Sequence, residues 1–206
     1  MSLWAAMRDR QIGPVPTIDQ PVDTPLLAWT DSLFIRGSIR TARRLSDDLN
    51  ANDDLIIDDA TVLTAGAPMS AARRLARFEI DPLELAVVLG RPVDPRLRLA
   101  RAIRRVHKVT FPVLVAGDGL EIRGSIHVLP GAMPDTVLRR NGPMFFALTE
   151  PSVRRFGRIV SDGLTDVALV NRYAVTRVEQ LDGMVDPWLA RAREAAARIG
   201  NPRDLS

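Results

Sequence analysis

Residues able to bind a metal ion are scarce in this sequence. His107 and His127 are its only histidines and cysteine is absent, so a zinc site would need carboxylates to complete its ligand set. Asp53-Asp54 and Asp58-Asp59 supply carboxylates, but the spacing and the central glycine of an EF-hand calcium loop are missing. We therefore predict no metal site, and we expect His127, inside a predicted strand, to be hydrogen-bonded and structural.

Nucleophilic and nucleotide-dependent catalysis also lack their usual patterns. Ser38 and Ser125 each follow a glycine, but the next residue is isoleucine and the Gly-x-Ser-x-Gly pattern of a catalytic serine is not formed. Neither the phosphate-binding loop nor the Gly-x-Gly-x-x-Gly dinucleotide fingerprint is found. We therefore predict a protein that is not an enzyme, with no catalytic residue and no cofactor.

Positive charge is concentrated between residues 91 and 108. Leu99, Ile103 and Val106 recur there at helical spacing, which predicts a linker helix with arginines on one face. Such a face suits phosphate groups, so this segment is the candidate nucleic-acid contact. Its contact residues would be Arg96, Arg98, Arg101, Arg104, Arg105 and Lys108.

The overall charge gives weaker support for nucleic-acid binding. The pI is 10.4, yet the net charge is only +3, because 28 Lys and Arg residues are opposed by 25 Asp and Glu residues. Few groups titrate between the carboxylates and arginine, so a small positive excess raises the pI far.

The lack of cysteine and of a long apolar run predicts a cytoplasmic protein that does not contact membranes.

The elements that would position these residues come from an internal duplication. The segment Ile35-Arg36-Gly37-Ser38-Ile39 recurs 87 residues later as Ile122-Arg123-Gly124-Ser125-Ile126. Further matches at the same offset indicate duplication rather than chance. At that offset the flanks pair Pro25 with Pro112, Leu27 with Leu114, Asp31 with Asp118 and Leu33 with Leu120.

Each copy predicts a β-hairpin. Residues 25–29 and 109–115 are β-rich runs followed by polar breaks, and each pentapeptide then lies in the second strand. Gly124 lies where a β-bulge or a close backbone approach is expected. Arg36 and Arg123 are expected to face solvent or a partner, as a pseudo-symmetric surface.

Further short elements follow each hairpin. We predict short helices at 46–51, with Ser46 as the N-cap, and at 134–140. A third strand at 55–57 or 145–148 is expected to end at Asp59 or Glu150. The last strand is predicted at 85–89 in the first copy and at 167–170 in the second, where it continues through Tyr173, Val175 and Val178. Between its third and last strands, the first copy alone predicts a helix over 70–77 with Leu75 buried.

The predicted fold class is mainly β with short helices (α+β). Two pseudo-symmetric small β units, barrel-like or fused into one sheet, are followed by a C-terminal helix, for which Asp186, Pro187 and Gly200 supply start and stop signals. The expected organisation is an N-terminal helix and proline-rich arm at 1–22, β units at 23–95 and 96–185, and the C-terminal helix and tail at 186–206.

The repeated pattern resembles a family of small bacterial β-rich domains of unknown function. The residues that carry the resemblance are an Arg-Gly-x-Ile strand at 36–39 and 123–126, a Leu-Ser-Asp-Asp-Leu-Asn helix at 45–50, and a Leu-Thr-Glu strand end at 148–150. The resemblance implies architecture and brings no catalytic residues. A distant topological similarity to Sm-like and SH3-like small barrels is an analogy of fold alone.

These observations favour a non-catalytic function. We predict a protein-interaction or assembly module built on a duplicated β unit, whose partner is another protein or a second copy of the chain. The alternative is nucleic-acid binding through residues 91–108, with affinity that falls steeply with salt.

Overall fold

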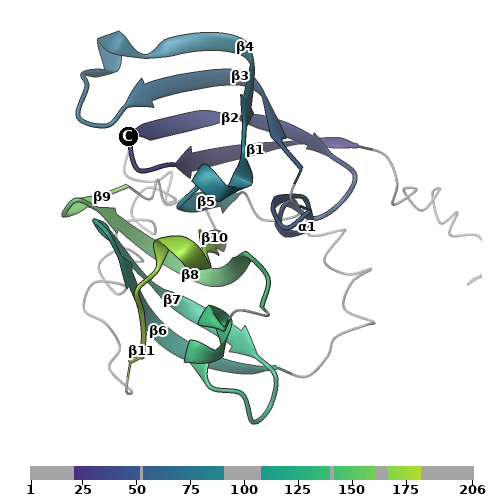
Figure 1. Ribbon diagram of the computed structural model, residues 1–206, viewed down its shortest axis with the longest axis vertical. Helices are drawn as coiled ribbons and strands as arrows, with labels where there is room; N and C mark the ends of the chain where they lie inside the picture. The colour runs from purple at the N-terminus through teal and green to yellow at the C-terminus, as the bar shows by residue number, and fades with distance from the viewer. Residues whose placement is uncertain (1–20, 52, 91–107, 140–141, 161–166, 182–206) are drawn as a thin grey trace, which may run out of the picture.

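The computed structural model describes residues 21–51, 53–90, 108–139, 142–160 and 167–181. The protein is mainly β, with one antiparallel sheet of eleven strands and a few short helices (Figure 1). The sheet is open, because β4 and β11 form its two ends and no described pairing joins them, so barrel closure is not shown. The helix predicted at 186–206 lies outside the described residues, as does nearly all of the arm at 1–22.

The strands fall into two series with the same order in the sheet. The first is ordered β5-β1-β2-β3-β4 and the second β11-β6-β7-β8-β10, with β9 paired to β8. The first series contains β1 (Val22–Trp29), β2 (Leu33–Thr41), α1 (Leu45–Leu49), β3 (Leu55–Thr64), η1 (Met69–Ala71), β4 (Arg73–Ile80), η2 (Pro82–Glu84) and β5 (Val87–Gly90). The second contains β6 (Val109–Gly117), β7 (Leu120–Val128), η3 (Pro134–Leu138), β8 (Phe145–Arg155), β9 (Arg158–Ile159), β10 (Val167–Asn171), η4 (Arg172–Ala174) and β11 (Arg177–Gln180).

The repeated glycine lies opposite a β-bulge in both series, which confirms the prediction made for Gly124. Two residues of β3, Asp59 and Ala60, oppose Gly37, because the register steps from Arg36–Thr61 to Ser38–Asp58. The same step occurs opposite Gly124. Asp59 and Glu150 have φ of 50° and 51°, so each bulge contains an acidic residue in the left-handed region.

Several predicted elements differ from the structure. The third strands do not end at Asp59 and Glu150 but bend there and continue to Thr64 and Arg155. The helix predicted over 70–77 is wrong, because pairing with β3 makes Arg73–Ile80 a strand. Ser46 is not an N-cap: α1 begins at Leu45, after Arg44, without a side-chain cap.

The predicted equivalence of the last strands is also wrong. By register, β10 corresponds to β4, since both pair with the third strand of their series. The strand that corresponds to β5 is β11, since both pair with the first strand. The match extends to the backbone hydrogen bond just before each of these strands. Before β5, Ala86 N donates to Trp29 O, and before β11, Thr176 N donates to Ala116 O.

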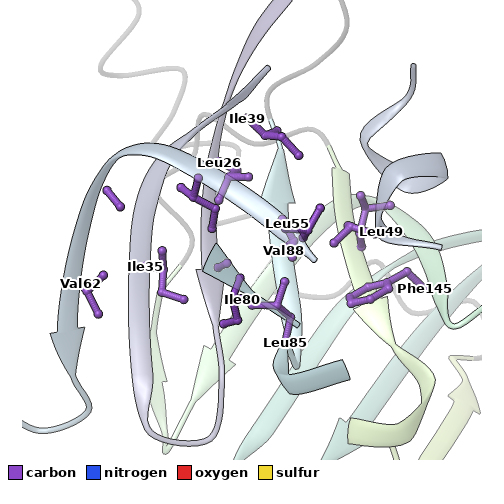
Figure 2. Close-up of a cluster of buried hydrophobic side chains, with 14 of the residues drawn as sticks. Leu26, Ile35, Ile39, Leu49, Leu55, Val62, Ile80, Leu85, Val88 and Phe145 are labelled. Atoms are coloured by element: carbon purple, nitrogen blue, oxygen red, sulfur yellow. The ribbon is translucent and has the colours of Figure 1, made fainter. Parts of the chain in front are cut away.

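The two series meet where β5 pairs with β10, and this strand pair divides two hydrophobic cores. Val88 and Leu169 contribute to the core of the first series, where Phe145 of β8 also lies among side chains of the first series (Figure 2). Their neighbours Val87, Leu89, Ala168 and Val170 contribute to the core of the second series. Both strands are therefore buried on two faces.

Gly37→Ala should lower the free energy of unfolding by about 3 kcal/mol, because overpacking costs of this order arise when neighbours cannot move. An added Cβ would lie 2.5 Å from Ile57 Cγ2 and 2.8 Å from the Asp58 carbonyl oxygen. The control is Gly131→Ala, where φ is +84° but no atom lies within 4 Å, so only the backbone cost of about 1 kcal/mol applies. Urea unfolding measures both, and an equal or smaller loss for Gly37→Ala would contradict the account of the bulge.

Candidate functional site

A groove crosses the first series of strands on the face opposite its core. Its floor follows one row of directly opposed residues, in which the register joins Leu89 to Leu27, Leu27 to Arg36, Arg36 to Thr61 and Thr61 to Arg74. The row crosses β5, β1, β2, β3 and β4. Four strand spacings of about 4.8 Å give it a length of about 19 Å.

The chemistry of the groove changes along its length. The end near β5 is apolar and is lined by Leu27, Phe34 and Val160 of the second series, together with Leu89, which is buried in the core of that series. The end near β4 contains Arg36 and Arg74, both exposed and separated by the half-buried Thr61. The groove therefore combines an apolar surface with a positively charged one.

The two arginines of the groove have no partner among the described residues. No ion pair or hydrogen bond joins Arg36 or Arg74 to another described side chain. Asp59 is the one carboxylate among the lining residues. Two cations against one anion leave an excess of positive charge, which favours a ligand carrying negative charge.

The matching surface of the second series has different chemistry. Arg123 corresponds to Arg36, but its Nε lies 3.4 Å from the carboxylate of Glu121, at the position that Phe34 occupies in the first series. Glu179 pairs with Leu114 where the first series has Leu89. Among its described residues, the second series therefore lacks both the apolar end and the unopposed charge.

The groove is large enough for a segment of a macromolecule. Its volume is about 1220 Å³, above the range of about 300–1,000 Å³ that is usual for small-molecule sites. An extended chain advances about 3.3 Å per residue, so about six residues would span the 19 Å row. Size and shape thus fit a peptide segment better than a small ligand.

The residues predicted as functional from the sequence lie in separate places. Arg36 is in the groove, whereas Arg123 lies on β7, and four strands separate β7 from β2 in the sheet. Of the basic segment, only Lys108 is described, and it is exposed. Arg96, Arg98, Arg101, Arg104 and Arg105 lie outside the described residues, as does His107.

Arg74, Phe34 and Leu89 were not predicted as site residues. These residues can be found only from the row of opposed residues, and recognising that row requires knowing the register of five strands. Local sequence does not contain that register, and the segment around Arg74 was interpreted as a helix.

His127 is hydrogen-bonded, as the sequence predicted. Its Nδ1 lies 2.9 Å from Thr110 Oγ1 and its Nε2 lies 2.9 Å from Thr149 Oγ1, so it connects β6, β7 and β8. A catalytic histidine normally activates a nucleophile while a third group orients it, but both partners here are hydroxyls.

Among the described residues, no three His, Cys, Asp or Glu side chains are grouped as metal ligands, and no helix is long and apolar enough to span a membrane.

Two side-chain amides, of the half-buried Asn50 and the buried Asn171, hold the two series in register. Asn50, after α1, accepts from Phe145 N at 2.8 Å and donates to Phe145 O at 3.2 Å. Asn171, at the end of β10, donates to Leu85 O at 2.8 Å and to Leu83 O at 3.3 Å. Each amide satisfies backbone groups of the other series, so these side chains specify how the series join.

Arg155 is the most buried cation of the described residues, with 6% of its surface exposed. Its Nη2 donates to Thr30 O in the β1–β2 turn, so it also joins β8 to the first series. Burial lowers the pKa of Arg155, while Asp31 and Asp118 act in the opposite direction. Asp31 and Asp118 occupy matching turns of the two series, so a carboxylate from each hairpin turn acts on Arg155. We interpret it as a structural cation.

No protein-family model, curated protein or solved structure matches this chain.

Asn171→Asp should lower the free energy of unfolding by about 3 kcal/mol, because a buried carboxylate would face the carbonyls to which the amide now donates. The matched control is Asp81→Asn at the corresponding position of the first series, where the change should stay within about 0.5 kcal/mol. Both side chains accept from the backbone N–H two residues ahead, so this bond is kept in both variants. Equal effects at the two positions in urea unfolding would contradict the role of Asn171.

Proposed function

We propose that this protein is a non-catalytic interaction module that binds an extended, acidic and partly apolar segment of another protein. The observation that carries the proposal is the groove, where two exposed arginines without described partners continue an apolar floor in one register row. Arg36 and Arg74 would meet carboxylates, and the surface around Leu27 and Phe34 would receive apolar side chains.

We further propose that the scaffold consists of two copies of one β unit that have diverged in function. The equal strand order, the two bulges and the repeated glycine support this history. The differences support the division of roles, because Phe34 and Leu89 in the first copy are replaced by Glu121 and Glu179 in the second. In this proposal the second unit supports the site and the first unit provides it.

Binding can be tested with a fluorescein-labelled peptide of about eight alternating aspartate and leucine residues, a length that covers the row. Fluorescence anisotropy should show binding that weakens about tenfold, or about 1.4 kcal/mol, in Arg36→Gln/Arg74→Gln. Added salt should weaken it as well, because both arginines are exposed. The matched control is Arg40→Gln, an exposed arginine of β2 outside the groove, which should bind as the parent does.

Three outcomes would contradict the proposal. A peptide with lysine in place of aspartate could bind equally well, or the double variant could keep full affinity. A random single-stranded RNA could compete with the peptide and lose affinity in the same variant, which would assign the groove to nucleic acid. Backbone amide shifts in NMR show whether the peptide contacts β1–β4.

A further inference from the structure

The described part of the sheet ends at two edge strands, β4 and β11. Among the described strands, β4 pairs only with β3 and β11 pairs only with β6. Inside the chain, β5 pairs with β10, and β11 and β4 are their counterparts. The β4 edge of one chain and the β11 edge of the next therefore have the backbone geometry of a junction that already exists. A head-to-tail contact of this kind repeats into rings or filaments unless something prevents it.

The register predicts how such a contact would be arranged. The internal junction pairs Val170 with Val87, Leu169 with Val88, Ala168 with Leu89 and Val167 with Gly90. The corresponding contact between chains would pair Ile80 with Arg177, Glu79 with Val178, Phe78 with Glu179 and Arg77 with Gln180.

Charged residues replace the apolar residues of the junction at both edges. On β4, the counterparts of Val167 and Leu169 are Arg77 and Glu79. On β11, Arg177 and Glu179 replace Val87 and Leu89. All four charged side chains are exposed, and none directly opposes an opposite charge in the predicted pairing. Pairing the edges would therefore take Arg77, Glu79 and the Arg177–Glu179 ion pair, whose Nη1 and Oε1 lie 3.2 Å apart, out of water with no opposite charge facing them across the contact. Removing these ions from water is unfavourable.

The polar contacts of the junction are missing as well. Asn171 donates to Leu85 O across the junction, but its counterpart is Asp81, directly after β4, whose carboxylate would face a carbonyl. Arg155 donates to Thr30 O across the junction. Its counterpart in β3 is Thr64, so this arginine contact is missing at the β4 edge.

We infer that Arg77, Glu79 and Asp81 on one edge, and Arg177 and Glu179 on the other, prevent copies of this chain from joining through β4 and β11. The two edges form a latent interface for a second copy. The strand contact that joins the two units therefore forms once, between β5 and β10, and charged residues oppose it at β4 and β11.

The test places the residue types of the internal junction on each edge separately. One variant carries Arg77→Val, Glu79→Leu and Asp81→Asn, and the other carries Arg177→Val and Glu179→Leu. Sedimentation velocity should find the parent and each variant as monomers, and an equimolar mixture of the two variants as a species of twice the monomer mass. Both sets in one chain should give rings or filaments. The control, Asp23→Leu/Arg40→Val, makes an exposed pair within the β1–β2 hairpin apolar and should stay monomeric alone and in mixtures.

Two results would overturn the inference. One is a parent protein that already associates, with β4 and β11 amides protected from hydrogen exchange on association. The other is a mixture of folded variants that stays monomeric. If an apolar variant precipitates, glutamine at the same charged positions removes the charge without adding apolar surface. A mixture of these glutamine variants should then associate at least tenfold more tightly than the parent, and no gain would equally reject the inference.

Discussion

The structure depends on one strand pair, β5 with β10, which is buried on both faces. Because successive side chains of a strand point to opposite faces, Val88 and Leu169 fill one core while Val87 and Val170 fill the other. Neither core is complete without residues of the opposite series. The same pair places Leu89 at one end of the groove and brings Val160 beside it. The β5–β10 strand pair therefore both joins the two series and sets the position of the candidate site.

Sequence predicted the features that depend on local chemistry. The repeated glycine was expected where backbones approach closely, and Gly37 and Gly124 lie opposite matching bulges. Both hairpins were expected from polar breaks between apolar runs. The β4 strand was missed because its arginines around Leu75 have helical spacing, and only pairing with the distant β3 makes it a strand. The residues of β11 were predicted to continue the 167–170 strand, whereas η4 ends that strand and β11 pairs with β6 instead.

The candidate site could be predicted only in part for the same reason. Arg36 was singled out by its repetition, but its partners in the row come from four other strands. Repetition also indicated a symmetric surface with Arg123, whereas the structure shows divergence. Phe34 and Glu121 occupy matching positions, and that single difference leaves one arginine unopposed and the other paired. Comparing the two series position by position therefore identifies the candidate site better than the shared motif does.

The central claim is that the β5–β10 pair makes the two series one cooperative body. Native-state hydrogen exchange tests it most directly, because it gives an opening free energy for each amide. We predict that slowly exchanging amides of β2 and β7, one from each series, share a single opening free energy equal to that of global unfolding. We expect the same value for the amides of Val88 and Leu169. Two distinct values, with one series opening while the other stays protected, would contradict the claim.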